Sequence, residues 1–98
     1  MNRQEELEYI HDGILCTILH RLVNPLSDGT LVPGYTSNPN DIIPLVTENN
    51  ISTTSPEELH CGDMWGCEKL TPNGYLCTSD KNPLRAAVVL LILLKEDE

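Results

Sequence analysis

The chain has 98 residues, the size of one domain with one modest core. Fifteen acidic and six basic side chains give a formal charge of −9, and with no Phe and one Trp the core must consist mainly of Leu, Ile and Val. Scarce, scattered cations argue against direct binding to nucleic acid, which requires clustered Lys or Arg. The negative charge suits docking on a basic protein surface, and it equally suits plain solubility.

A long amphipathic helix is predicted for residues 3–23. Hydrophobic residues recur at spacings of three and four from Leu7 to Leu22. Acidic residues gather near the amino-terminal end, where the helix dipole favours negative charge. The helix should end at Asn24-Pro25, because a residue before proline is pushed out of the helical region. A loop over residues 24–37, with Asp-Gly and Pro-Gly turn signals, should follow.

A second, shorter helix is predicted for residues 39–49. Asn38 can cap it and Pro39 suits its first position. Pro44 removes a backbone donor about one turn into the helix, so we expect a bend there. Residues 51–54 are candidates for a short strand.

A β-hairpin is predicted for residues 62–79. Its turn is the segment Thr71–Gly74, in which Pro, Asn and a left-handed Gly occupy the positions that a type I turn favours. A last helix over residues 83–95 begins at an Asn-Pro cap and is hydrophobic nearly all round. Such a helix is either the centre of the core or covered by a second subunit, so a homodimer is one arrangement to consider.

Together these elements predict an α+β fold: one small domain, residues 1–98, with three helices packed on a short antiparallel sheet or hairpin in the order α-α-β-β-α. The longest apolar run, residues 86–94, is far short of the ~20 residues that span a bilayer. The first residues are acidic where a signal peptide is basic. We therefore expect no membrane association, a cytosolic location and reduced thiols.

The residues best suited to bind a metal are His60, Cys61, Cys67 and Cys77. Structural zinc sites usually use ligand pairs two to four residues apart, and this spacing lacks them. A Cys67–Cys77 disulfide is a weaker alternative, because in a hairpin these residues would be diagonal neighbours or on opposite faces. We expect cysteines that act as small hydrophobic residues, with no metal, and keep a zinc-stabilised module as an alternative.

No catalytic motif is present, so we expect no enzyme activity and no cofactor. His11 and His20 lie nine residues apart on the predicted helix and thus on opposite sides of it. A pairing of Cys67 with His60 stays open from spacing alone. Trp65 is either a packing residue of the sheet, the favoured interpretation, or an exposed binding residue.

The carboxyl-terminal two thirds of the chain resembles a family of small bacteriophage proteins named for NinX, of the phage α-β-α sandwich group. The resemblance covers residues 35–96, and the Asn-Pro-Leu-Arg-Ala-Ala run is its most specific part. The matching positions are Tyr35, Pro39, Asp41, Pro44, Glu48, Asn49, Ile51, Ser52, Trp65 and residues 82–87. It implies a phage-encoded intracellular α+β protein with no catalytic residues to transfer.

The leading hypothesis is therefore a non-enzymatic phage accessory protein in the host cytoplasm. It would bind and inhibit a host protein with a basic, nucleic-acid-facing surface, most plausibly a defence component such as a CRISPR effector. An alternative is an oligomer that sequesters a nucleotide signal, with Arg85 at a helix start as its cation. The candidate partner-binding residues are Glu5, Glu6, Glu8, Asp41, Glu48, Glu57, Glu58 and Trp65.

Overall fold

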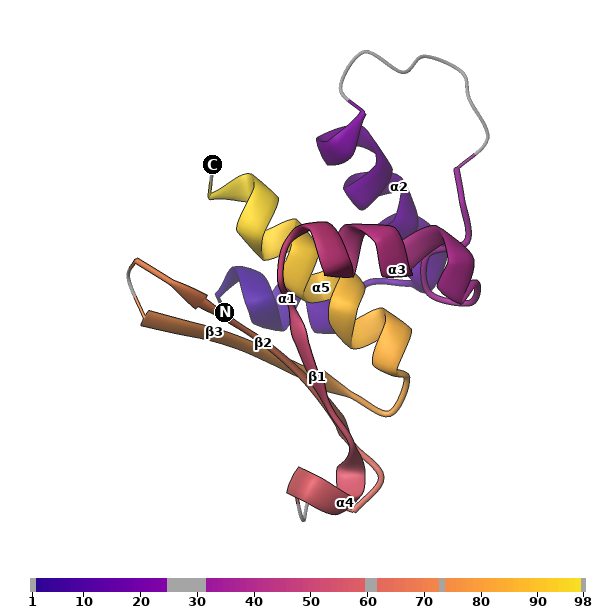
Figure 1. The fold of residues 1–98 in the computed structure, drawn as a ribbon. Helices are drawn as coiled ribbons and strands as arrows, with labels where there is room; N and C mark the ends of the chain where they lie inside the picture. Colours follow the sequence, from indigo (N-terminus) through magenta and orange to yellow (C-terminus); the bar gives the residue numbers. More distant parts are fainter. Residues whose placement is uncertain (1, 25–31, 60–61, 73, 98) are drawn as a thin grey trace.

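The computed structural model describes residues 2–24, 32–59, 62–72 and 74–97, and it confirms the α+β fold (Figure 1). Helices and a three-stranded antiparallel sheet form one small domain. In chain order the elements are α1 (Arg3–Glu8), α2 (Asp12–Val23), α3 (Pro39–Glu48), β1 (Ser52–Thr54), α4 (Pro56–Leu59), β2 (Trp65–Thr71), β3 (Gly74–Asp80) and α5 (Pro83–Glu96).

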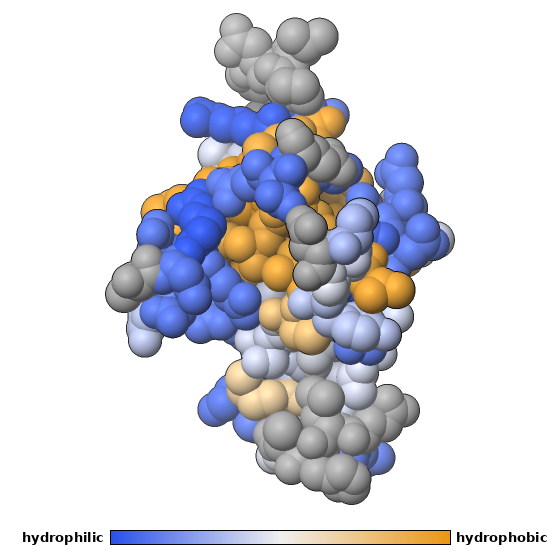
Figure 2. All heavy atoms as spheres, turned by 90° about the vertical axis from the view of Figure 1, so that its left-hand side faces the viewer, coloured by the Kyte–Doolittle hydropathy of each residue, from blue (hydrophilic) through white to orange (hydrophobic). Residues whose placement is uncertain are grey.

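The last helix, α5, is the centre of the core. Its seven consecutive residues from Ala86 to Ile92 are buried. The side chain of Asn82 accepts a hydrogen bond from the backbone N–H of Leu84 and caps the helix, as its Asn-Pro start predicts. The sheet packs on one side of α5, and α2 and α3 pack on the other (Figure 1). Burial within one chain therefore explains the apolar character of residues 86–92 without a second subunit. Figure 2 shows that further hydrophobic residues gather in the middle of one face, with hydrophilic residues on both sides.

The sheet has the strand order β1-β2-β3, and α5 covers one of its faces (Figure 1). Cys67 and Thr78 are register partners on that inner face, and both are buried. The hydroxyl of Thr78 donates a hydrogen bond to the carbonyl of Ala86 at 2.7 Å and ties β3 to α5. Among the described residues, helices cover one face only, whereas the family resemblance implies a sandwich with helices on both.

The hairpin and the second helix agree with the sequence predictions. Gly74 opens β3 with φ +118°, a left-handed backbone that glycine adopts without steric cost. The hydroxyl of Thr71 donates to the carbonyl of Gly74 across the turn. Helix α3 contains Pro44 within its length, and the candidate strand over residues 51–54 is β1.

The prediction of one helix over residues 3–23 is wrong. The chain forms two helices, α1 and α2, separated at residues 9–11. At the break Arg85 donates hydrogen bonds to the carbonyls of Leu7, Glu8 and Ile10 and so stabilises a backbone that leaves the helical ladder. The side chain of His11 then accepts a hydrogen bond from the N–H of Gly13 and caps α2.

Two further differences concern connections between elements. The short helix α4 is not among the elements predicted from the sequence. Within the predicted loop of residues 24–37, Tyr35 and Thr36 are buried, so these two residues belong to the core. None of the described helices has both the length and the apolar composition needed to cross a membrane.

Candidate protein-binding surface on the sheet

The sheet presents one face to solvent, which we call the outer face. Cys67 and Thr78 point toward α5, and because strand side chains alternate, their neighbours along each strand point away from it. Most of these neighbours are exposed, while Thr54 and Gly66 are half-buried. The outer face consists of Ser52, Thr54, Gly66, Glu68, Leu70, Tyr75, Cys77 and Ser79.

The strand register arranges the outer face in three rows. The first row holds the small residues Thr54, Gly66 and Ser79, and the second holds Ser52, Glu68 and Cys77. The third row is the cross-strand pair Leu70 and Tyr75, whose exposed fractions are 64% and 71%. A large apolar pair held this far into solvent contributes little to folding, and rigid exposed aromatic residues are typical of binding surfaces.

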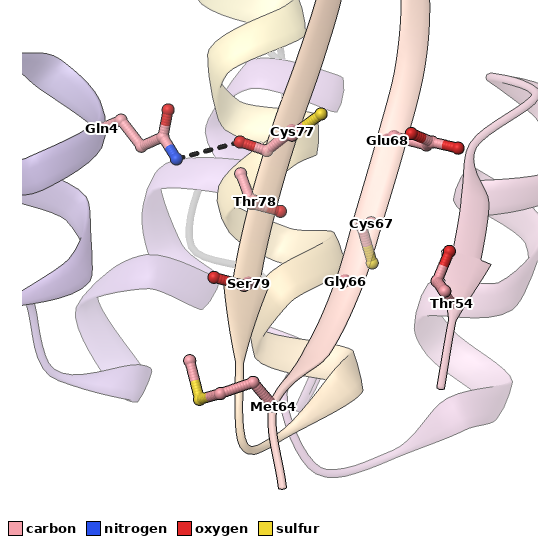
Figure 3. Close-up of a pocket in the computed structure, with 9 residues that line it drawn as sticks. All are labelled: Gln4, Thr54, Met64, Gly66, Cys67, Glu68, Cys77, Thr78 and Ser79. Atoms are coloured by element: carbon pink, nitrogen blue, oxygen red, sulfur yellow. Dashed lines mark hydrogen bonds between the residues drawn. The ribbon is translucent and has the colours of Figure 1, made fainter. Parts of the chain in front are cut away.

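A hollow of about 380 Å³ lies over the first two rows (Figure 3). Gly66 of β2 is one of its lining residues and contributes no side chain. At the β3 edge, the side-chain amide of Gln4 donates a hydrogen bond of 2.9 Å to the carbonyl of Cys77, which holds α1 against the sheet. The lining residues are Gln4, Thr54, Met64, Gly66, Cys67, Glu68, Cys77, Thr78 and Ser79.

Arg85, the cation of the nucleotide hypothesis, is engaged inside the fold. Its side chain is 13% exposed and forms ion pairs with Asp12 and, at 3.2 Å, with Asp80. Its remaining donors bind the three carbonyls at the end of α1 and the α1–α2 connection. With its donors so occupied, Arg85 joins α1, α2 and β3 to α5 and does not offer an anion site.

The acidic residues predicted to bind a partner do not gather into one patch. Glu5, Glu6 and Glu8 are exposed on α1, and Glu6 pairs with Arg3. Asp41 and Glu48 lie on α3, on the opposite side of α5 from the sheet (Figure 1).

Glu57 is exposed on α4, at the end of the sheet away from α3 (Figure 1), and the side chain of Glu58 lies outside the described residues. The predicted set is therefore spread over three elements. Of the described acidic side chains in this set, Asp41 is half-buried and the others are solvent-exposed, and they do not form one site.

Trp65 and Cys67 take the positions expected of packing residues, whereas Cys77 is exposed. Trp65 is half-buried on the inner side of β2, in register with Asp80. Cys67 pairs with Thr78, and Cys77 pairs with Glu68, so the two thiols lie on opposite faces of the sheet. This geometry excludes the Cys67–Cys77 disulfide and a zinc site that uses both thiols. His60 and Cys61 lie outside the described residues.

The cysteines should differ sharply in reactivity. Cys77 is exposed on the outer face, whereas Cys16 and Cys67 are buried. We expect iodoacetamide at neutral pH to alkylate Cys77 at least about tenfold faster than Cys16 or Cys67, because buried thiols react only after local opening. Peptide mapping by mass spectrometry measures the three rates separately. Equal rates at Cys67 and Cys77 would contradict the assignment of the two faces.

Two buried groups should make the fold less stable at alkaline pH. Burial raises the pKa of the Cys67 thiol above 9.0, although a hydrogen bond from Thr53 opposes the shift. Burial, and then the charge of Asp41, raise the pKa of the Tyr35 phenol above 10.0. In each case the unfolded chain loses its proton first. These two groups therefore leave the free energy of unfolding unchanged below pH 9.0 for Cys67 and below pH 10.0 for Tyr35. As the pH rises through these values, the free energy of unfolding falls by at most about 1.4 kcal/mol per pH unit for each group.

Urea unfolding between pH 7.5 and pH 10.5, with a reductant present, checks this expectation. Cys67→Ala should make the decline shallower than in the unmodified chain, and the exposed-thiol control Cys77→Ala should leave it unchanged. A decline that is the same in all three proteins would show that ionisation of Cys67 does not contribute.

Sequence reasoning missed the residues that make the outer face distinctive, namely Gly66, Glu68, Leu70 and Tyr75. Alternation along the predicted hairpin was available as a signal, but which set of residues faces solvent depends on where α5 packs.

The chain was compared with protein-family models, with curated proteins and with solved structures, and none of the three comparisons found a match.

Proposed function

We propose that this chain is a non-enzymatic protein-binding module that uses the outer face of its sheet to bind and inhibit a host protein. The observation that carries the proposal is the exposed pair of Leu70 and Tyr75 beside a hollow, on a sheet face that no described helix covers. Such a face combines an apolar anchor with a polar surround, the composition of protein interfaces.

The resemblance to NinX-like phage proteins and the charge of −9 support the choice of partner. A phage accessory protein in the host cytoplasm would meet nucleic-acid-binding proteins, whose basic grooves attract an acidic ligand. We therefore propose a host defence component, such as a CRISPR effector, as the target. Arg85, which the nucleotide alternative requires, is occupied by oxygens of the chain itself.

Affinity capture from a lysate of the phage host, with matched variants, tests this function. Leu70→Asp places a charge in the third row of the outer face, and Ile43→Asp makes the same change on α3, where Ile43 is 52% exposed. We expect one host protein to be captured by the unmodified chain and by Ile43→Asp, and at least about tenfold less of it by Leu70→Asp.

Phage plating on defence-positive cells gives the functional readout. Protection of the phage should be lost with Leu70→Asp and retained with Ile43→Asp. Capture that is equal for both variants, or the absence of a specific protein together with the absence of protection, would refute the proposal.

A further inference from the structure

The hollow on the outer face is lined by small residues of the central strand and its neighbours. Gly66 lies on β2, and the register places Thr54 and Ser79 on either side of it (Figure 3). None of these three residues has a large side chain. Met64 and Gln4 supply an apolar thioether and an amide at the margins. The hollow therefore suits a slender, partly apolar group.

Its electrostatic character is negative. Glu68 is the one residue with a formal charge among those that line the hollow, and it is exposed. In the described part of the chain, the carboxylate of Glu68 forms no ion pair. The hydroxyls of Thr54 and Ser79 add further acceptors. A group that brings N–H donors and a positive charge would satisfy this lining.

We propose that the hollow receives the side chain of a lysine or arginine from the partner protein. The alkyl stem would lie over Gly66 and against Met64, and the cationic group would meet the carboxylate of Glu68. Lysine and arginine combine such an apolar stem with a charged end. This inference rests on the proposed function and adds the chemistry of the partner: a basic side chain next to an apolar contact for Leu70 and Tyr75.

The same features disfavour a second copy of this chain as the occupant. A two-fold dimer through the outer face would bring two copies of the same surface together, and that surface has Glu68 as its one charged residue. Each carboxylate would then lose water without gaining a cation, which costs free energy. A nucleotide is disfavoured for the same reason, since its phosphates would meet Glu68.

Titration of the isotope-labelled full chain, followed by amide chemical shifts, tests the inference with defined probes. The probes are N-acetyl-arginine amide and N-acetyl-lysine amide, with uncharged N-acetyl-norleucine amide as the control. We expect at least one cationic probe to bind in the millimolar range and to shift the amides of Gly66, Glu68 and Ser79. Glu68→Gln should weaken this binding about threefold or more, and Glu57→Gln, on α4, should leave it unchanged.

Three results would overturn the inference. The first is that the norleucine probe causes saturable chemical-shift changes as large as those of the cationic probes. The second is that Glu68→Gln binds the cationic probes with unchanged affinity. The third is that neither cationic probe shifts the amides at the hollow. Its failure is distinguishable from failure of the proposed function. If the probes fail while Leu70→Asp still abolishes partner capture, the outer face binds its partner without a basic side chain in the hollow.

Discussion

Arg85→Ala is expected to lower the free energy of unfolding by about 3 kcal/mol, a large share of the roughly 5–15 kcal/mol that stabilises a typical domain. The substitution leaves Asp12 and Asp80 without their cation and removes the guanidinium donor from the carbonyls of Glu8 and Ile10. Unpaired polar groups of this kind lose their hydrogen bonds and keep part of their desolvation cost. Urea unfolding followed by circular dichroism measures the loss.

Arg3→Ala is the matched control, because it changes the net charge by the same amount. Arg3 is 42% exposed and pairs with Glu6 and Glu96 at the surface. Surface pairs contribute little, so the loss should stay below about 1 kcal/mol. Arg85→Lys should recover a minority of the loss, since one ammonium group cannot reproduce the forked geometry of the guanidinium. Equal losses for Arg85→Ala and Arg3→Ala would contradict the central role of Arg85.

Leu90→Ala is expected to cost about 3 kcal/mol of unfolding free energy. Leu90 lies on α5 and is fully buried between the sheet and the other helices. Its truncation removes packing contacts and leaves a cavity that a rigid core fills only in part. The control is the identical change Leu70→Ala at the exposed position on β2, which should cost less than about 0.5 kcal/mol.

Thermal and urea unfolding of both leucine variants give the comparison. A cost for Leu70→Ala that matches the cost for Leu90→Ala would mean that the outer face is buried in solution. In that case the outer face would not be available to a partner.

Local signals in the sequence were sufficient for most of the fold. These signals each act within a few residues, and the structure has the features that they predict. They are the Asn-Pro caps at Asn38 and Asn82, the left-handed Gly74 of the hairpin and the apolar run of α5. The break between α1 and α2 could not be predicted in this way. It depends on carbonyls bound by Arg85, which lies 75 residues after Ile10 in the chain.

The candidate binding surface was harder to predict for a related reason. Hydrophobic alternation identifies two sets of residues on a strand, but the packing of α5 decides which set is buried. Most of the described acidic side chains chosen from the sequence are exposed, yet they lie on separate helices. Only the strand register shows that Leu70 lies beside Tyr75, and that Glu68 lies next to the row of small residues that contains Gly66.

The residues that carry the resemblance to NinX-like proteins mostly maintain the fold. Tyr35 and Ile51 are buried, Asn82 caps α5, and Arg85 joins four elements. Of the residues that carry the resemblance, only Ser52 lies on the outer face. We therefore propose that the choice of partner comes from the outer face of this chain.

Site-specific photo-crosslinking in infected host cells tests most directly whether the outer face binds the partner. A benzophenone amino acid replaces Tyr75 on the outer face or, as the control, Tyr9 at the end of α1, which is 82% exposed. We expect a covalent adduct with one host protein from position 75 and none from position 9. An adduct from position 9 alone, or from neither position in cells where the protein protects the phage, would contradict the proposal.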